Sequence, residues 1–251
     1  MPWNPEQYHK FQSERSAPFY DLLKLVLIRP NLKAVDLGCG TGELTRILAD
    51  ALPESNVTGL DSSLQMLNKA ASYSSPNLKF EQGDLSALTG SWDLIFSNAA
   101  IQWSEDHENL IPQIFSTLNP VGQLCVQIPS NHHHISHLLI RETAKEAPFN
   151  KILNNFERIA PVLSIDQYAK ILFDQNAKDI IVFEKIYPHV LENSDAVVEW
   201  ISGTALVPYF ERLGEHKTEF VAVLQTKMKK ALPESPLLYP FRRILFSAKK
   251  Q

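Results

Sequence analysis

Three glycines and an acidic side chain stand close together in the stretch Val35-Asp36-Leu37-Gly38-Cys39-Gly40-Thr41-Gly42. Glycine at every second position after an apolar run permits a sharp turn from a strand into a helix, and it lets the backbone approach a ligand closely. The stretch therefore predicts a polar cofactor above the edge of a sheet. The alternative is a purely structural turn followed by an unrelated acid, and Asp36 by itself could instead cap the following helix.

Further polar residues stand where later predicted strands end. Asp61 follows one strand, Asp84 with Gly83 follows the next, and Asn98 follows a third. Because the carboxyl ends of parallel strands meet at one edge, these residues should share one crevice. Asp61 comes about 20 residues after the glycine turn, the spacing at which a carboxylate can accept both hydroxyls of a ribose.

The spacing of the glycines separates two kinds of cofactor. Dinucleotide-binding turns have the pattern G-x-G-x-x-G, which places a pyrophosphate on the helix N-terminus. Here the pattern is G-x-G-x-G, with Asp36 two residues before its first glycine. A carboxylate so close would repel pyrophosphate and favour an ammonium or sulfonium. The pattern thus favours S-adenosylmethionine over NAD.

The elements that must position these residues alternate between strand and helix. Apolar runs predict strands over 32–37, 57–61, 78–81, 92–97, 123–128, 180–186 and 241–248. Helical periodicity predicts two N-terminal helices within 3–28 that are interrupted near Pro18, then helices after the glycine turn and over 62–70, 109–118, 164–176, 194–202 and 218–232. A turn is expected at 119–122. The alternation predicts an α/β fold: a Rossmann-like, mostly parallel sheet with helices on both faces and an antiparallel closing strand.

We expect one domain, 1–251, with helical embellishments. Residues 1–28 would lie over the cofactor site and 30–130 would form the cofactor-binding core. The helical cap would be built from insertions at 131–162 and 190–235, and 163–189 and 236–251 would complete the core. This division follows from a change of rhythm after Pro129, where a His-rich segment without β-branched runs begins.

Composition limits the partners. With 44% hydrophobic and 21% charged residues, a net charge of -4 and a pI of about 6.1, the chain has no broad basic surface, and we expect no nucleic acid partner. Two cysteines, Cys39 and Cys125, without metal-ligand spacing favour a reduced cytoplasmic setting. No signal segment or membrane span is expected, and the composition fits a monomer. His132-His133-His134 is expected to be solvated, with no metal bound, because consecutive residues cannot all face one ion.

Several motifs together resemble a known family. They are Val35 to Gly42, Asp61, Gly83-Asp84-Leu85 and the stretch from Asp93 to Trp103. The sequence in these motifs is similar to the class I S-adenosylmethionine-dependent methyltransferases. A narrower resemblance, to the trans-aconitate 2-methyltransferases, covers nearly the whole chain and is most specific in the N-terminal half. It is carried by Trp3-Asn4-Pro5, Tyr8, Glu14-Arg15, Gly59 to Ser63, Asn98-Ala99, Gln102-Trp103, Asn119-Pro120 and Gln127, and more thinly by Arg141-Glu142, Tyr187, His189, Glu199-Trp200, Gly203-Thr204 and Phe241-Arg242-Arg243.

The resemblance implies roles for individual residues. Those expected to bind the cofactor S-adenosyl-L-methionine are Arg15, Asp36, Gly38, Cys39, Gly40, Asp61, Ser62, Asp84, Leu85, Asn98 and Ala99. Gln102 and Trp103 would be the catalytic floor where methyl donor meets acceptor. Cations that would clamp a carboxylic acid substrate are His137, Arg141, His189, Arg242 and Arg243.

The implied reaction is methyl transfer to a carboxylate of a small organic acid. Such an acid, with a pKa of about 4, is already ionised at neutral pH, so no general base is needed. Alignment of the reactants in a dry site should supply most of the rate. Two alternatives are a malonyl acyl-carrier thioester as acceptor, as in biotin synthesis, and a non-catalytic cofactor-binding regulator. Val207 stands where the family usually has arginine before Pro208, which weakens the assignment of a tricarboxylate.

Overall fold

A computed structural model of the protein describes residues 12–251, and their side chains from Ser16 onward. The helices are α2 Gln12–Leu23, α3 Glu43–Ala51, α4 Leu64–Ala70, α5 His107–Ser116, α6 Ile135–Lys145, α7 Phe149–Ile152, α8 Ile165–Asp174, α9 Ser194–Ser202, α10 Val207–Leu213 and α11 Lys217–Ala231. The strands are β1 Lys33–Leu37, β2 Asn56–Asp61, β3 Leu78–Gln82, β4 Trp92–Asn98, β5 Leu118–Pro129, β6 Lys178–Leu191 and β7 Leu237–Lys249. Short 3-10 helices include η2 Leu85–Ala87, η3 Ile101–Trp103 and η4 Asn131–His133.

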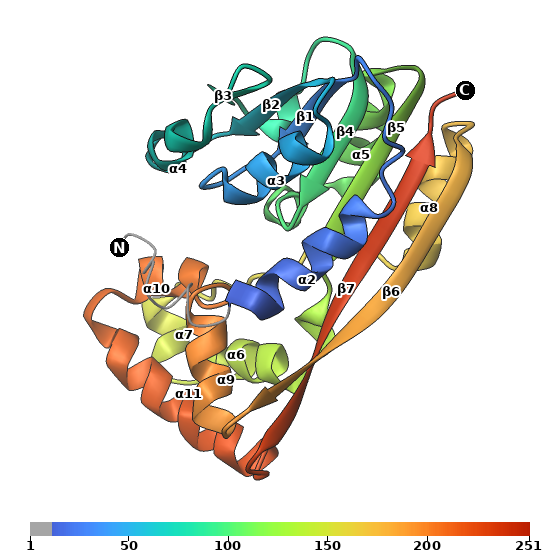
Figure 1. Cartoon of the computed structure of the whole chain (residues 1–251). Coiled ribbons are helices and arrows are strands. Elements are labelled where there is room, and N and C mark those ends of the chain that lie inside the picture. The colour runs from blue at the N-terminus through green and yellow to red at the C-terminus, as the bar shows by residue number, and fades with distance from the viewer. Residues whose placement is uncertain (1–11) are drawn as a thin grey trace. The chain divides into compact units, whose positions relative to one another are not determined.

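Within the described residues the strands form a seven-stranded sheet in the order β3-β2-β1-β4-β5-β7-β6 (Figure 1). The pairs from β3 to β5 are parallel, and β7 runs antiparallel to β5. This confirms the predicted fold class and its antiparallel closing strand. The order of the strands reverses between β1 and β4. Ligands of open parallel sheets bind outside the strand ends at such a switch point.

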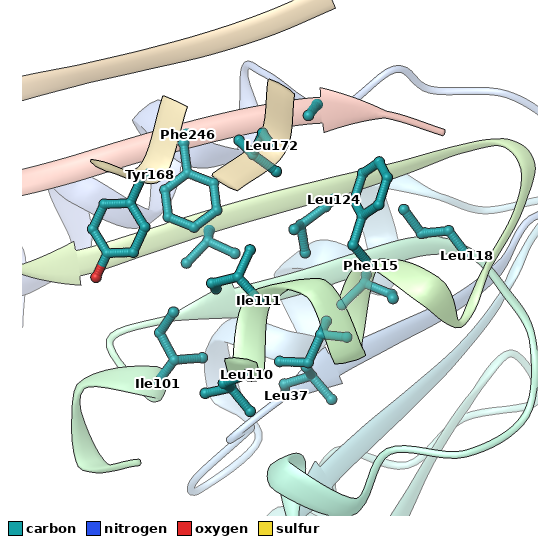
Figure 2. Packing of buried hydrophobic residues seen from close by; sticks show 14 of the residues in the cluster. Leu37, Ile101, Leu110, Ile111, Phe115, Leu118, Leu124, Tyr168, Leu172 and Phe246 are labelled. Carbon is teal, nitrogen blue, oxygen red and sulfur yellow. The ribbon is translucent and has the colours of Figure 1, made fainter. Parts of the chain in front are cut away.

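Helices cover both faces of the sheet with separate apolar clusters. One cluster joins α2 and α3 to the sheet through Phe19, Leu22 and Leu48. Figure 2 shows the other, in which Ile111 of α5 and Tyr168 of α8 pack under the sheet. The two faces alternate along each strand, so the side chains of β1 point in turn toward α3 and toward α5.

The structure corrects three details of the predicted elements. Helix α2 runs through Pro18, where an interruption was expected; burial of Phe19 and Leu22 offsets the cost of the lost N–H, about 3 kcal/mol. The predicted turn at 119–122 lies inside β5 as a bulge, since Trp92 pairs with Leu118 and Leu94 with Gln123. Helix α10 forms between the two predicted helices 194–202 and 218–232, where the sequence pattern predicts no helix.

The chain divides into two compact units. The core unit comprises residues 15–129, 161–185 and 243–251, and the helical unit comprises 130–160 and 186–242 with described residues up to 14. Strands β6 and β7 each contribute to both. The predicted limits of core and cap stay a prediction of domain organisation.

Aromatic side chains pack the helical unit. Phe220 of α11 contacts Phe149 of α7, with ring centroids 5.0 Å apart, and stacks on Tyr209 of α10 at 6.2 Å. Helix α11 also lies against α6, where Lys227 binds Glu142 at 2.9 Å and Glu146 at 2.7 Å. The unit therefore has an apolar core of its own.

Candidate active site

The glycine turn joins β1 to α3 at the edge of the sheet. Gly38, Gly40 and Gly42 all have positive φ, at 75°, 55° and 81°, a region that side chains with a Cβ rarely adopt. The Gly38 N–H donates to the carbonyl of Leu60 at the end of β2, at 2.8 Å. The turn is therefore held to the neighbouring strand by its backbone.

The glycines differ in the space around them. A Cβ on Gly38 would lie 2.2 Å from Cβ of Ala100, and one on Gly42 would lie 2.8 Å from Cβ of Ala70. A Cβ on Gly40 would meet no atom within 4 Å in the described chain. Gly38 and Gly42 are thus required by packing, whereas Gly40 faces open space.

Asp61 ends β2 beside this turn. One carboxylate oxygen accepts the N–H of Gly40 and the other accepts the N–H of Ser63, both at 2.9 Å. Each oxygen retains further lone pairs. The carboxylate is therefore fixed beside Gly40, and Ser62 next to it is exposed. Their expected roles in cofactor binding stay predictions.

Asp36 is buried, with 4% of its surface exposed, and points toward α3. The hydroxyl of Thr45, in the first turn of α3, donates to it at 2.6 Å. Burial raises the pKa of Asp36 from 3.8 to about 7; the charge of Asp61 adds to this rise and the Thr45 hydrogen bond opposes it. The N-cap of α3 is Gly42, so Asp36 does not occupy the capping position.

Asp84 lies exposed at the start of η2. Its Oδ1 accepts the N–H of Ser86 at 2.8 Å and the Ser86 hydroxyl at 2.7 Å, which lowers its pKa. Leu85 is half-buried and packs on the apolar cluster of α5. The cofactor-binding roles expected of Asp84 and Leu85 stay predictions. Cys39, also in the predicted set, is 8% exposed, and burial raises the pKa of its thiol.

The predicted catalytic floor is a short loop after β4. Ala99 has a φ of 53°, and its N–H donates to the carbonyl of Gln127 on β5 at 3.0 Å. The Gln102 side chain donates to the carbonyl of Ala99 at 2.6 Å, and Trp103 is 51% exposed. The loop is thus hydrogen-bonded to β5, and the half-exposed indole of Trp103 lies at its end.

The buried side chain of His107 makes a hydrogen bond to the same loop. His107 Nε2 lies 2.8 Å from the carbonyl of Ile101, and Nδ1 lies 2.6 Å from the hydroxyl of Tyr168. The Tyr168 oxygen accepts the N–H of Leu163 at 3.2 Å. The carbonyl requires Nε2 to carry the proton, so the tyrosine hydroxyl donates to Nδ1. Burial lowers the pKa of His107, which favours this neutral form.

The sequence alone does not predict these hydrogen bonds, because His107 stands in the run Glu105-Asp106-His107-Glu108, whose local pattern indicates only an acidic helix start. Figure 2 shows Ile101 and Tyr168 directed into the cluster that surrounds α5. Gln127 enters the sequence-based expectations only through the family resemblance. The available signal was a glutamine inside the apolar run 124–128, which only a hydrogen-bonding role or a ligand explains.

Four of the predicted substrate residues belong to the helical unit. His137 and Arg141 stand one turn apart on α6. Burial and the nearby charges of His134, His132 and Arg141 lower the pKa of His137 to about 3. Arg141 pairs with Glu157 at 3.7 Å.

His189 contacts two aromatic rings of the helical unit in tilted geometry, with ring centroids 4.9 Å apart for Trp200 and 5.7 Å apart for Phe241. The backbone N–H of Arg242 donates to the side chain of Asn131. Arg243 lies instead in the core unit, on β7, and is 6% exposed. The side chain of Arg15, predicted to bind the cofactor, lies outside the described side chains.

The described residues hold no group of three or more His, Cys, Asp or Glu side chains arranged to bind a metal ion. Among the same residues no helix combines the length and the apolar character that crossing a membrane demands.

Comparisons with known proteins identify the family. The model of the family described as a methyltransferase domain matches residues 28–199. The trans-aconitate 2-methyltransferase of Deinococcus radiodurans is 46% identical over 99% of this chain and 98% of its own. That of Variovorax paradoxus is 34% identical over 100% and 99%.

Solved structures show the same fold. The S-adenosylmethionine-dependent methyltransferase of Mesorhizobium loti matches with a TM-score of 0.52 and 19% identity, over 94% of this chain and 100% of its own. Phosphoethanolamine N-methyltransferase 2 of Haemonchus contortus, in complex with S-adenosyl-L-methionine, matches with a TM-score of 0.56 and 18% identity, over 93% and 52%.

The sheet order and the polar strand ends define the class I S-adenosylmethionine-dependent methyltransferases, for which S-adenosylmethionine is the cofactor. The chain belongs to the methyltransferase domain family, and the trans-aconitate 2-methyltransferases named above are full-length relatives.

Proposed function

We propose that the protein transfers a methyl group from S-adenosylmethionine to a carboxylate of a small organic acid. The products would be a methyl ester and S-adenosylhomocysteine. The acceptor would be trans-aconitate or a less charged relative. The observation that carries this proposal is the 46% identity, along nearly the whole chain, to an enzyme named trans-aconitate 2-methyltransferase.

The core unit offers a place for the methyl donor, which when bound supplies an electrophilic methyl group. Gly40 leaves open space above the turn, and Asp61 presents a fixed carboxylate beside it. Asp36 would lie near the ammonium group, Asp84 would read the adenine, and Asn98 with Ala99 would border the reacting methyl. Gln102 and Trp103 would orient the reactants and exclude water.

An ionised carboxylate fits the character of the floor. Residues 98–103, Asn-Ala-Ala-Ile-Gln-Trp, contain no acid or base. A carboxylate loses no proton on methylation, whereas an alcohol must, so a floor without a titratable group suits the acid. A cation at the attacking oxygen would reduce its nucleophilicity. Arg141, Arg242 and Arg243 would instead bind the other carboxylates of the substrate as cations, and His137 and His189 would bind them through ring N–H groups.

Val207 bears on the charge of the acceptor. It begins α10 and is half-buried, and it cannot make the bidentate bond that arginine makes to a carboxylate. A dicarboxylate is therefore included among the proposed acceptors. The relatives described above favour a small acid over a malonyl thioester or a regulatory role.

We further propose a monomeric, cytoplasmic enzyme that acts on small acids and binds neither nucleic acid nor membrane. Two free, buried cysteines and a net charge of -4 support this. Light scattering on a sizing column tests the monomer: an apparent mass near 28.4 kDa is expected, and a mass near twice that value contradicts it.

A radiolabelled-methyl screen over carboxylic acids and acyl-carrier thioesters tests the function. Base-labile label in trans-aconitate or a smaller polycarboxylate is expected, because methyl esters hydrolyse in base. Added S-adenosylhomocysteine should suppress the signal as a control. Label found only in an amine or phenol would defeat the proposal.

A further inference from the structure

Gln127 carries an amide that the described chain leaves unsatisfied. Its side chain is fully buried, with 0% exposed. Neither Oε1 nor Nε2 has a hydrogen-bond partner among the described residues. Because both atoms lack partners, this holds for either orientation of the amide. Buried amides are nearly always paired, and an unpaired one costs stability. A cost of this kind indicates a group that is kept for a ligand.

Asn98, next to Gln127 in the sheet, carries a similar side-chain amide. Asn98 ends β4 and pairs in register with Gln127 on β5, so both side chains point to the same face of the sheet. Its Oδ1 is also buried and has no partner in the described chain. The pair stands at the carboxyl ends of the strands, directly before the floor loop that begins at Ala99. Two neutral amides therefore stand side by side on one face of the sheet, near the carboxyl ends of β4 and β5.

A third buried polar side chain lies nearby on the same face. Arg243 of β7 pairs with Pro129, while Gln127 pairs with Leu245. Gln127 and Arg243 are thus diagonal neighbours across the antiparallel pair, with Cα atoms about 7–8 Å apart. One neutral donor and one cation on adjacent strands match a ligand with more than one carboxylate.

We propose that Gln127, with Asn98 beside it, is a specificity-determining residue that holds the methyl-accepting carboxylate. This rests on the proposed function. The Gln127 N–H donates to the carboxylate oxygen that does not attack. A neutral donor fixes the group without withdrawing electron density as a cation would, so the attacking oxygen keeps its nucleophilicity.

Gln123 supplies a matched control on the same strand. It too is buried, at 4% exposed. Its amide, however, is satisfied: Oε1 accepts the N–H of Leu27 at 2.9 Å, and Nε2 donates to the Leu25 carbonyl and the Ser247 hydroxyl, both at 2.8 Å. Gln123 and Gln127 are one residue type on one face of one strand. They differ in whether the folded chain already uses the amide.

The test compares Gln127→Met with Gln123→Met, since methionine keeps the length of glutamine and removes its polar atoms. For Gln127→Met we expect an unchanged or higher melting temperature, because an unpaired amide is removed. We expect S-adenosylhomocysteine affinity within about twofold of the parent protein. The value of kcat/KM for trans-aconitate should fall about tenfold to hundredfold, as for a lost hydrogen bond to a charged group. Gln123→Met should melt lower and retain the KM.

Three results would overturn the inference. The first is a fall in melting temperature for Gln127→Met as large as that for Gln123→Met. The second is an unchanged kcat/KM for the acid. The third is a loss of S-adenosylhomocysteine binding with the acid KM intact, which would place the amide in the donor pocket. If the parent protein methylates no carboxylic acid, the proposed function fails, and this inference fails with it before any variant is compared.

Discussion

Asp36 and Asp61 are two carboxylates of one turn with different surroundings. Asp61 accepts hydrogen bonds from two backbone N–H groups. Asp36 is buried against α3 and accepts one hydrogen bond, from the hydroxyl of Thr45. Burial therefore acts on Asp36 without enough hydrogen bonds to oppose it. Asp36 is the group whose ionisation should be visible in the pH dependence of stability.

The first prediction concerns that dependence. The folded-state pKa of Asp36 is raised from 3.8 to about 7, so the native state holds a proton that the unfolded chain releases. The contribution of Asp36 to the free energy of unfolding should fall by a few kcal/mol as the pH rises from about 4 to about 7. Above that pH it should level off. Asp36→Asn cannot ionise and lacks this contribution. Urea unfolding of both proteins at several pH values measures the difference; a constant difference would contradict the prediction.

The second prediction concerns Asp61 and the cofactor. Asp61→Ala should weaken S-adenosylhomocysteine binding by about 1.5–3 kcal/mol, the range for hydrogen bonds to a charged group. Calorimetry measures it. Asp93 is a matched control, because it also accepts two hydrogen bonds, from the Lys33 N–H and the Asn119 amide, both at 2.8 Å, at the opposite ends of β1 and β4.

Asp93→Ala should therefore lower the melting temperature and leave the affinity unchanged. Equal losses of affinity in the two variants would mean that general loosening, and not a ribose contact, explains the effect of Asp61→Ala.

At the scale of elements, the glycine turn meets two requirements: close packing at Gly38 and open space at Gly40. One substitution at each position can test them separately. Gly38 packs against Ala100, which links the loop after β1 to the loop after β4. Gly40 instead borders open space. The same chemical change, addition of one methyl group, should thus disturb packing at one position and ligand binding at the other.

The third prediction follows from this contrast. Gly38→Ala should lower the melting temperature strongly, since its Cβ would lie 2.2 Å from Cβ of Ala100, and Gly38→Ala with Ala100→Gly should recover part of the loss. Gly40→Ala carries only the strain of positive φ, about 1–2 kcal/mol, yet should weaken S-adenosylhomocysteine binding more than Gly38→Ala with Ala100→Gly does. Thermal melts and calorimetry on the three variants decide it. Intact binding in Gly40→Ala would show that the space is not part of the site.

Local patterns explain how much of the fold was predictable. The strand ends with Asp61, Asp84 and Asn98 follow from apolar runs and turn residues, which act over a few positions. Whether Pro18 breaks a helix depends on what Phe19 and Leu22 bury against, and that is decided by distant strands. The bulge at 119–122 likewise depends on pairing with β4.

The site shows the same division. The glycine turn and its carboxylates could be found because their spacing itself carries the chemistry. The hydrogen bond between His107 and Tyr168 joins residues that lie 61 positions apart, and the spare amide of Gln127 is recognisable only when its neighbours are known to offer no partner. Both are consequences of packing, which no local pattern of the sequence indicates.

At the scale of the whole molecule, the two predicted halves of the reaction fall on different units. The residues predicted to bind the methyl donor all lie in the core unit, which begins at Arg15. Most of the predicted substrate cations lie in the helical unit, and Arg243 belongs to the core. The ligands should therefore leave separate signatures along the chain.

The last prediction uses amide hydrogen exchange to map them. S-adenosylhomocysteine alone should protect residues 38–42, 61–63 and 98–103, because ligand contact reduces local opening. Adding trans-aconitate should extend protection to α6, where His137 and Arg141 stand. In Arg141→Gln the first pattern should persist and the second should weaken, because a neutral amide replaces the charge that attracts the acid. Protection by trans-aconitate confined to the core unit would mean that the acid is bound without the helical unit, and that Arg243 with Gln127 carries its recognition.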